Sequence, residues 1–353
     1  MTGTITVVAS TAYPAVVASA RVRLVEMGEH MTAHGVELVY RPSMSDAEYR
    51  AATGAGTVGT QAAALLRGAA VAQRPQHHDR GAISLVHRLR SLLPIPRDLY
   101  RTVDAFDFDD AIYVSSLGAH RRPLSLLKLE AGRAVHQIRA ARLVLAGNGY
   151  LADAAAGLRG GISGIEVLPS CVNPEAYPLR QHEEGEVLTL GWTGSPTTSA
   201  YLGAILGWLR PLGLKGRIRL LAMGANLPRA EGWIECLPWS LQGEAALLER
   251  IDVGLMPLLD DPWTRGKCGY KLLRYAAAGV PSVGSPVGVN AQMFESGCGI
   301  AARNQAEWHE ALRTLSNPAV RREVGVAARA HVERAYSFCV WAPVAAQLLQ
   351  RLS

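Results

Sequence analysis

One stretch decides the fold of this chain: Asp252-Val-Gly-Leu-Met-Pro-Leu-Leu-Asp-Asp-Pro-Trp-Thr-Arg-Gly-Lys-Cys-Gly-Tyr-Lys-Leu-Leu-Arg-Tyr-Ala-Ala-Ala-Gly-Val-Pro-Ser-Val-Gly-Ser-Pro-Val-Gly288. An apolar run over residues 251–256 predicts a strand, and a polar loop follows it. Residues 270–278 predict a helix, which Gly279 ends. A second apolar run over 280–283 predicts another strand. Strand, loop, helix and strand form a βαβ crossover, which implies a parallel sheet.

The predicted helix start has the chemistry of an anion site. Gly266 and Gly269 keep side chains away from the backbone there. The first amides of a helix lack internal partners and lie at the positive end of its dipole. If the helix extends back to Lys267, then Lys267, Lys271 and Arg274 share one face, where a diphosphate would relieve their repulsion. The alternative is a solvated basic face, but a loop at the carboxyl end of a strand favours a ligand.

The composition is that of an ordinary soluble globular protein. A chain of 353 residues suggests about two domains, and its net charge of +6 permits an anionic substrate without demanding one. The five cysteines are scattered without a CxxC pair, which argues against disulfides or zinc and fits a reducing cytosol. No apolar run is long enough to span a membrane, and the N-terminus does not have the pattern of a signal peptide. We therefore expect a cytoplasmic protein, while its oligomeric state is left open.

The first half of the chain opens as a second doubly wound domain. Residues 4–9 and 36–40 predict strands on either side of a helix that reaches about residue 34. Arg21 and Arg23 lie near the start of this helix, at the edge of the sheet where ligands bind. The alternative of two ordinary surface arginines stays open.

An acidic cluster follows a later strand. Asp107-Phe-Asp109 matches the Asp-x-Asp of metal-dependent glycosyltransferases, but three letters make a weak motif. We instead expect Asp109 and Asp110 to line a cleft, where they would bind hydroxyl groups or position an acceptor nucleophile. The alternative is a turn and helix cap that uses aspartate for its backbone hydrogen bonds.

Two further segments of the first half match sequence patterns that are associated with a function. Residues 121–142 predict a helix with six basic side chains and one acid, as on helices that bind anionic lipid. That helix lacks Trp and Phe, so a solvated face is favoured. Gly147-Asn-Gly149-Tyr-Leu-Ala152 matches a dinucleotide fingerprint and keeps an NAD enzyme as an alternative. The fingerprint belongs on the first strand of its domain, however, and this strand comes late.

A new domain begins after the polar linker 180–186. Residues 187–193 predict a strand that ends in a Gly-Ser turn, where the amides of Gly194 and Ser195 can face a phosphate. Further strands are predicted over 218–223 and 234–236.

These motifs together resemble one family. Gly191-Trp-Thr-Gly-Ser195, the apolar strand from Asp252, Lys271-Leu-Leu-Arg-Tyr-Ala-Ala-Ala-Gly-Val-Pro281 and Gly284-Ser-Pro-Val-Gly288 resemble the donor half of family 4 (group 1) glycosyltransferases of the GT-B fold. The resemblance implies an α/β fold with two Rossmann-like doubly wound domains facing across a cleft. It places the acceptor-side domain at 1–174, the donor domain at 175–336, and a helix crossing back to the first domain at 337–353.

The resemblance also implies a function. It suggests a retaining, metal-independent glycosyltransferase that moves a sugar from a nucleoside-diphosphate sugar to a small-molecule or glycan acceptor. It implies no cofactor, no metal ligand, no nucleic-acid partner and at most weak membrane contact. The residues expected to contribute to catalysis are Lys267, Lys271, Asp109 and Asp110. Donor binding is expected at Gly194, Ser195, Trp239, Gly266, Gly269, Tyr270 and Arg274, and cleft or acceptor contacts are expected at Arg21, Arg23 and His120.

One feature departs from the family pattern. Many members carry Glu-x7-Glu, with one acid near the sugar and one on the ribose, whereas this chain has Gly266 and Arg274 at those positions. The roles of those acids do not carry over. Two alternatives therefore remain open beside the NAD enzyme: a GT-B-type nucleotide-sugar epimerase that needs no acceptor, and an inactive GT-B scaffold that binds a partner.

Overall fold

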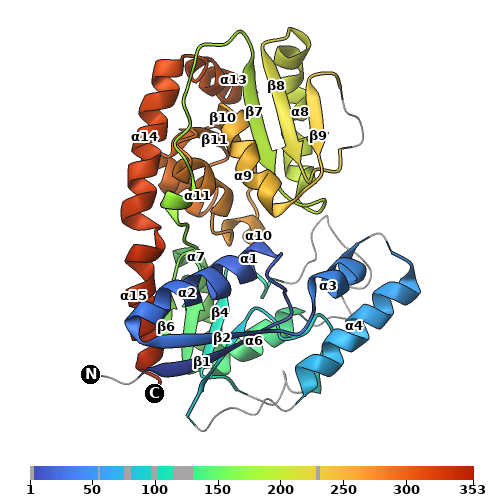
Figure 1. The fold of residues 1–353 in the computed structure, drawn as a ribbon, viewed down its shortest axis with the longest axis vertical. Helices are drawn as coiled ribbons and strands as arrows, with labels where there is room; N and C mark the ends of the chain where they lie inside the picture. Colours follow the sequence, from blue (N-terminus) through green and yellow to red (C-terminus); the bar gives the residue numbers. More distant parts are fainter. Residues whose placement is uncertain (1–3, 55, 75–80, 97–101, 115–129, 228–230) are drawn as a thin grey trace. The chain divides into compact units, whose positions relative to one another are not determined.

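The computed structural model describes residues 4–54, 56–74, 81–96, 102–114, 130–227 and 231–353. The chain divides into two compact units, each built on its own six-stranded sheet (Figure 1). The first unit contains residues 1–171 together with 266–268 and 338–353. The second contains 172–265 and 269–337. A three-residue segment of the quoted stretch therefore packs as part of the first unit.

The sheet of the first unit is parallel in every strand pair, with the order β2-β1-β3-β4-β5-β6. The order reverses between β1 and β3, and such a switch point opens a crevice at the carboxyl ends of the strands. The elements of this unit are β1 (Ile5–Thr11), α1 (Ala18–Ala20), α2 (Met27–Met31), β2 (Val36–Pro42), α3 (Asp46–Thr53), α4 (Val58–Gln73), β3 (Ile83–His87), β4 (Ala105–Phe108), α6 (Glu130–Ala140), β5 (Leu143–Ala146), α7 (Gly149–Arg159), β6 (Ile165–Val167) and α15 (Phe338–Gln350).

The first helical region is not a regular α-helix. A π-helical segment, Arg21–Glu26, joins α1 to α2, and Gly35 ends the region in the left-handed conformation at φ 75°. Segments of this kind are rare and are frequently found at functional sites. The segment buries both Arg21 and Arg23, so the alternative of two surface arginines is wrong.

The sheet of the second unit is also parallel, with the order β12-β11-β10-β7-β8-β9. Numbered within the unit, this is the 3-2-1-4-5-6 order of the Rossmann fold, whose switch point lies between β7 and β10. The elements are β7 (Leu188–Thr193), α8 (Ser199–Leu214), β8 (Ile218–Met223), β9 (Ile234–Leu237), α9 (Leu241–Arg250), β10 (Val253–Met256), α10 (Pro262–Arg265), α11 (Tyr270–Ala277), β11 (Ser282–Gly284), α12 (Val289–Glu295), β12 (Gly299–Ala301), α13 (Gln305–Thr314) and α14 (Pro318–Ala335).

Helices cover both faces of this second sheet. Alternate residues of β8 enter opposite cores: Leu220 joins the cluster under α8 and α13, and Leu221 joins the cluster under α9, α11 and α14. This follows from the two-residue side-chain period of a strand. Gly254 of β10 is a glycine for a packing reason, because a Cβ there would lie 2.4 Å from the ring of Tyr275. The apolar runs read as buried strands because both faces are covered.

The structure confirms the predicted helix in the quoted stretch but not its conditional extension back to Lys267. Its α11 begins at Tyr270 and its N-cap is Gly269, which has φ 65°. Lys267 therefore lies before the helix and does not share a face with Lys271 and Arg274. Gly279 ends the helical region at φ 67°, in agreement with the prediction.

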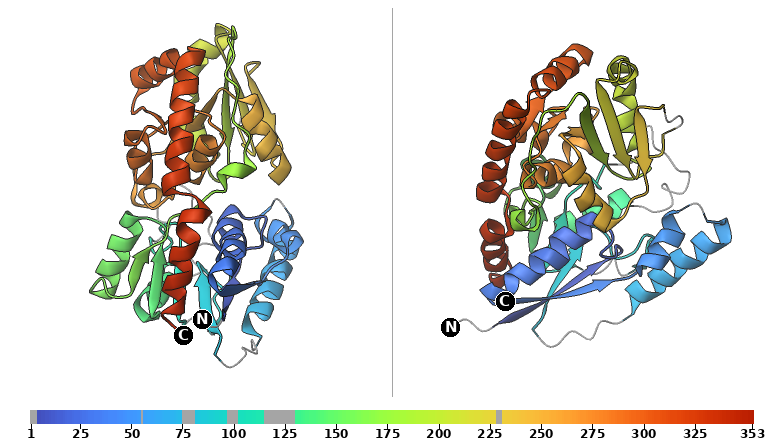
Figure 2. Two further views of the ribbon diagram at one scale, coloured as in Figure 1. Left: turned by 60° about the vertical axis from the view of Figure 1, so that its left-hand side comes forward. Right: turned by 45° about the horizontal axis from the view of Figure 1, so that its top comes forward.

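The last helix, α15, belongs to the first unit, where it packs against α2 (Figure 2). The ring of Phe338 stacks on that of His30, with centroids 4.8 Å apart. At the far end, the Gln350 side chain donates a hydrogen bond to the carbonyl of His34.

The described part of the basic segment is not a free cationic face. Arg133 on α6 is 1% exposed and donates to the Ser91 carbonyl, and Arg139 donates to the Leu158 carbonyl. Arg142 pairs with Asp104. The favoured interpretation, a solvated face, is therefore wrong for Arg133, which is buried, whereas Arg139 and Arg142 are exposed as it expects. Arg121, Arg122 and Lys128 lie outside the described residues.

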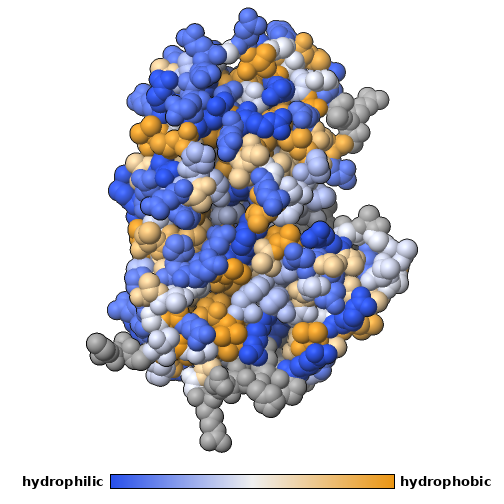
Figure 3. Space-filling view, in the orientation of Figure 1, coloured by the Kyte–Doolittle hydropathy of each residue, from blue (hydrophilic) through white to orange (hydrophobic). Residues whose placement is uncertain are grey.

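The structure also bears on membrane contact. Among the helices of the described ranges, none combines the length and the hydropathy that a bilayer crossing requires. On the face drawn in Figure 3, hydrophobic residues lie in small groups separated by hydrophilic ones.

Candidate functional site

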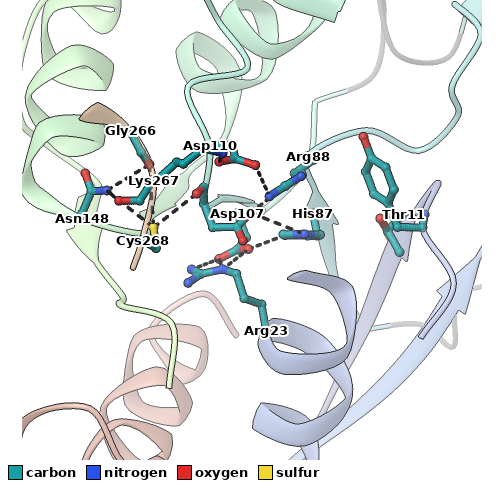
Figure 4. Close-up of polar contacts among 12 residues, drawn as sticks. Thr11, Arg23, His87, Arg88, Asp107, Asp110, Asn148, Gly266, Lys267 and Cys268 are labelled. Carbon is teal, nitrogen blue, oxygen red and sulfur yellow. Dashed lines mark hydrogen bonds and ion pairs between the residues drawn. The ribbon is translucent and has the colours of Figure 1, made fainter. Parts of the chain in front are cut away.

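Three carboxylates gather at the carboxyl edge of the first sheet. Asp107 is on β4, and Asp109 and Asp110 follow that strand directly. The neighbouring strand β3 ends at His87 and is followed by Arg88. Because both strands are parallel and paired, their ends lie at one edge of the sheet. There the side chains of Asp107 and Asp110 point toward those of His87 and Arg88 (Figure 4).

Asp107 is held by an arginine and a histidine. The guanidinium of Arg23 donates through Nε to Asp107 Oδ1 at 2.8 Å, donates again through Nη2 to Oδ2, and contacts the Leu168 carbonyl at 2.9 Å. His87 Nδ1 lies 2.6 Å from Asp107 Oδ1. Burial alone would raise the pKa of Asp107, but the charge and hydrogen bonds of Arg23, with those of His87, lower it below its ordinary value. Asp107 and Arg23 are therefore a neutralised buried pair, and this use of Arg23 was not foreseen from the sequence.

Arg88 bridges the other two carboxylates. Its Nε donates to Asp109 Oδ1 and its Nη2 donates to Asp110 Oδ2, each at 2.6 Å. Burial alone would raise the pKa of Asp109, but the charges of Arg88, His87 and Arg23 lower it far below its ordinary value. Arg88 has φ 56°, the one positive value of a described residue other than glycine. Such strain persists where surrounding contacts fix it, and it concentrates at functional sites.

The segment 266–268 closes over this cluster. Lys267 Nζ lies 3.5 Å from Asp110 Oδ1, and the Asn148 side chain donates to the carbonyls of Gly266 and Lys267 at 3.0 and 3.2 Å. A Cβ on Gly266 would lie 2.7 Å from the Cβ of Ala111. Gly266 is therefore required by packing, and it does not provide the open approach to a ligand that the sequence suggested.

The same segment fills the turn that resembles a dinucleotide fingerprint. A Cβ on Gly147 would lie 2.4 Å from Cys268 Sγ and 3.0 Å from Asp109 Cα. Asn148 uses its side-chain oxygen to cap α7 by accepting from the Leu151 amide. A pyrophosphate would need the space that Cys268 occupies. The alternative of an NAD enzyme using Gly147 to Ala152 is therefore wrong.

We expect Cys268 to be chemically inert in the folded protein. It is buried beside Asp109, and burial together with that carboxylate raises the pKa of its thiol. Cys171 and Cys298 are also buried, while Cys236 and Cys339 are exposed. Since the thiolate is the reactive form, a thiol reagent at neutral pH should label two cysteines quickly and all five only after denaturation. Mass spectrometry of the labelled peptides checks this, and fast labelling of Cys268 would contradict the packing around it.

The switch point of the second sheet is the other candidate site. Both amides of the turn after β7 already have protein partners. The Gly194 amide donates to the Met223 carbonyl of β8 at 3.1 Å, and the Ser195 amide donates to Thr198 Oγ1 at 3.0 Å. The expectation that these two amides face a phosphate is wrong for this conformation. Ser195 is exposed at the turn, whereas Thr198 is half-buried and its hydroxyl donates to the Ser195 carbonyl at 3.0 Å.

The start of α11 keeps the features of an anion site. Gly269 provides no side-chain cap to the helix, so the first-turn amides lie at the positive end of the dipole. Lys271 is half-buried there, and its Nζ lies 5.6 Å from the centre of the Trp192 ring. Tyr270 precedes it and is also half-buried. Lys271 and Tyr270 therefore both lie at the helix start for which the sequence predicted an anion site.

Arg274 has a different role from the one predicted. Its Nη1 lies 2.7 Å from Glu244 Oε2, and its Nε donates to the Tyr177 hydroxyl at 3.2 Å. Glu244 comes from α9 and also accepts from the Thr193 hydroxyl at 2.7 Å. Arg274 thus balances a buried carboxylate instead of joining a cationic face. The Glu244 carboxylate therefore lies next to Arg274, the residue at the second position of the family's Glu-x7-Glu pattern.

The remaining predicted residues divide into two groups. Trp239 is half-buried and packs against the core that contains α11, whereas His120 lies outside the described residues. Within the part of the chain that the structure describes, no three His, Cys, Asp or Glu side chains form a group able to hold a metal ion. Asp107 and Asp109, the two acids of the Asp-x-Asp motif, each face an arginine.

Two doubly wound sheets with these orders define the GT-B class, and comparison with solved structures agrees. Sucrose-phosphate synthase from Thermosynechococcus elongatus matches with a TM-score of 0.68 at 14% identity, covering 98% of each chain. HepE from Anabaena, solved with UDP and glucose, matches with a TM-score of 0.65 at 12% identity, covering 99% of each chain. TarM matches with a TM-score of 0.58 at 10% identity over 77% of this chain, which spans about half of TarM (55%). The prediction of the GT-B fold is confirmed.

Sequence comparisons add no further relative. No protein-family model matches the chain, and no curated protein matches it.

Proposed function

We propose that this protein is a glycosyltransferase that uses a nucleoside-diphosphate sugar as donor. The observation that carries the proposal is the start of α11 at the switch point of the Rossmann-type sheet, where Lys271 lies at the positive end of a helix that no N-cap side chain covers. A diphosphate fits such a helix start because both the dipole and the amides favour negative charge. The GT-B fold is the context in which this arrangement serves sugar transfer.

The proposed chemistry is retaining, metal-independent transfer to a small-molecule or glycan acceptor, without a cofactor. Lys271 and the amides of α11 would stabilise the charge that develops on the leaving diphosphate as the glycosidic bond breaks. The acceptor would attack from the face that the leaving group vacates, so no protein nucleophile is needed. Asp110, which lies between Arg88 and Lys267, is our candidate for contacts to acceptor hydroxyls.

Glu244 is our candidate for a group that the family pattern lacks. Glu244 is 7% exposed, and its carboxylate is held by Arg274 and by the Thr193 hydroxyl. We propose that the Arg274–Glu244 pair replaces the second acid of Glu-x7-Glu in shaping the nucleoside pocket.

Nucleotide binding tests the proposal directly. We expect one nucleoside diphosphate from a panel of UDP, GDP, TDP and ADP to raise the melting temperature in the presence of EDTA, because the site supplies its own positive charge. UDP is the first to try, since HepE was solved with it. A ligand at about 100 times its Kd should stabilise the protein by about 2.7 kcal/mol.

The other outcomes separate the alternatives. Stabilisation only with a divalent ion would contradict the metal-independent mechanism. Consumption of donor without any added acceptor would favour the epimerase. No response to any nucleotide would favour an inactive scaffold and overturn the proposal.

A further inference from the structure

A cavity of about 350 Å³ opens in the first unit at the carboxyl edge of its sheet. Its volume is in the range of small-molecule sites. The polar side chains that line it are Ser10, Thr11, Arg41, Ser43, Arg74 and Arg90. The remaining described lining residues are Pro42, Val71 and Ala72, so three guanidinium groups and three hydroxyl groups share the cavity with no Asp or Glu among its described lining.

The sheet topology brings these side chains together from four segments. Ser10 of β1 is the register partner of Arg41 of β2, which places the two side by side at the strand ends. The Ser43 amide donates to the Thr11 carbonyl at 2.8 Å, and the Ala12 amide donates to the Leu89 carbonyl at 2.5 Å. The second hydrogen bond holds the residue before Arg90 against the end of β1. Arg74 arrives as the C-cap of α4.

The site is built on rigid elements near the switch point between β1 and β3. Arg90 is 8% exposed, and Ser43 is 6% exposed. Within the described residues, the Ser43 hydroxyl is buried without a hydrogen-bond partner. A buried hydroxyl without a partner is costly, so a ligand that completes its hydrogen bonding would be favoured. Arg41 and Arg74 also line the cavity and are exposed.

We propose that this cavity binds the phosphate group of a phosphorylated, sugar-sized acceptor. Guanidinium groups match phosphate oxygens through paired charge-assisted hydrogen bonds, and Ser43 and Thr11 can supply further contacts to a tetrahedral anion. The cavity leaves room for a small organic group beyond the phosphate. The assignment as an acceptor site rests on the proposed glycosyltransferase function, whereas the assignment as a phosphate site rests on the cavity alone.

Calorimetry on the full chain at constant ionic strength tests this. The probes are inorganic phosphate, glucose 6-phosphate, fructose 6-phosphate and their neutral sugars. We expect at least one sugar phosphate to bind more tightly than inorganic phosphate, and neutral sugars not to bind. The double variant R41Q/R74Q should weaken that binding about tenfold or more, because each lost charge-assisted contact is substantial. Both side chains are exposed, so the double variant should fold. A third variant, Arg90→Gln, removes the buried guanidinium of the cavity.

Matched controls give every outcome a meaning. Arg50→Gln on α3 removes an exposed arginine of the same unit that lies outside the cavity, and it should leave binding unchanged. Equal affinity for inorganic phosphate and every sugar phosphate overturns the acceptor assignment. Absence of saturable binding, or binding that R41Q/R74Q leaves intact, overturns the site. UDP binding measured on the same samples keeps the two proposals separate, because it should depend on Lys271 and not on Arg41 or Arg74.

Discussion

Replacing Lys271 with alanine is expected to lower turnover by about 10²–10³-fold while the protein stays folded. The reason is that the Lys271 ammonium lies at the start of α11, where charge would develop on a leaving diphosphate, and one well-placed donor of this kind contributes about 10²–10³ to kcat. The measurement is release of nucleoside diphosphate from the donor identified by the binding panel, with circular dichroism to verify the fold.

The control for this variant is a lysine of the same unit outside the site. Lys215, the C-cap of α8, is exposed, and Lys215→Ala should keep wild-type turnover. The Lys271→Ala variant should also bind the nucleoside diphosphate more weakly, which a merely structural role would not produce. Turnover at the wild-type level in Lys271→Ala would remove the basis for the donor site.

The second large effect is expected at Asp107, on the stability of the first unit. The side chains of Arg23 and Asp107 are 2% and 3% exposed. Asp107→Ala would leave Arg23 as a buried charge without its carboxylate, and breaking such a pair costs about 3–5 kcal/mol. Urea unfolding measures the loss, and faster hydrogen exchange in β1 and β4 would locate it in this unit.

Two comparisons show whether charge is the cause. The double variant R23M/D107L should recover much of the loss, because a buried ion pair replaced by apolar groups is often near neutral. Arg50→Ala breaks a pair whose side chains are 71% and 50% exposed, so it should cost less than about 1 kcal/mol. If Asp107→Ala and Arg50→Ala had similar effects, the pair would not be a main contributor to stability.

Asp107 also gives the stability of this unit a pH dependence with a definite sign. Its folded pKa lies below the unfolded value of about 3.9. The contribution is therefore complete above about pH 4 and is lost as the pH falls through the lower folded value. The double variant R23M/D107L should lose the part of the acid sensitivity that Asp107 contributes.

The strands and helix ends were predictable because they depend on local chemistry. Apolar runs such as 251–256 became buried strands because both faces of a parallel sheet are covered. Gly35 and Gly279 ended their helical regions because glycine adopts positive φ at little cost. The parallel sheets followed from the alternation of strand and helix.

The partners of the charged side chains were not predictable from spacing along the chain. Arg23 and Asp107 are separated by 84 positions, and Lys267 and Asp110 by 157. Arg88 carried no motif, and the one sequence feature that pointed to it was its place directly after a buried strand. The contact between Glu244 and Arg274 was hidden because Glu244 lies on another helix.

By itself, the sequence determined two doubly wound units, the positions of their strands, and a basic helix start at the carboxyl end of one strand. Periodicity and helix capping are properties of neighbouring residues, so short stretches of the sequence are enough to predict these features. Only the tertiary structure decided where each cation lies. Arg23, Arg88 and Arg274 face buried carboxylates that the sheets bring to them, whereas Arg41, Arg74 and Arg90 line a cavity. Burial makes an unbalanced charge costly, and burial is set by packing between segments that are distant in the chain.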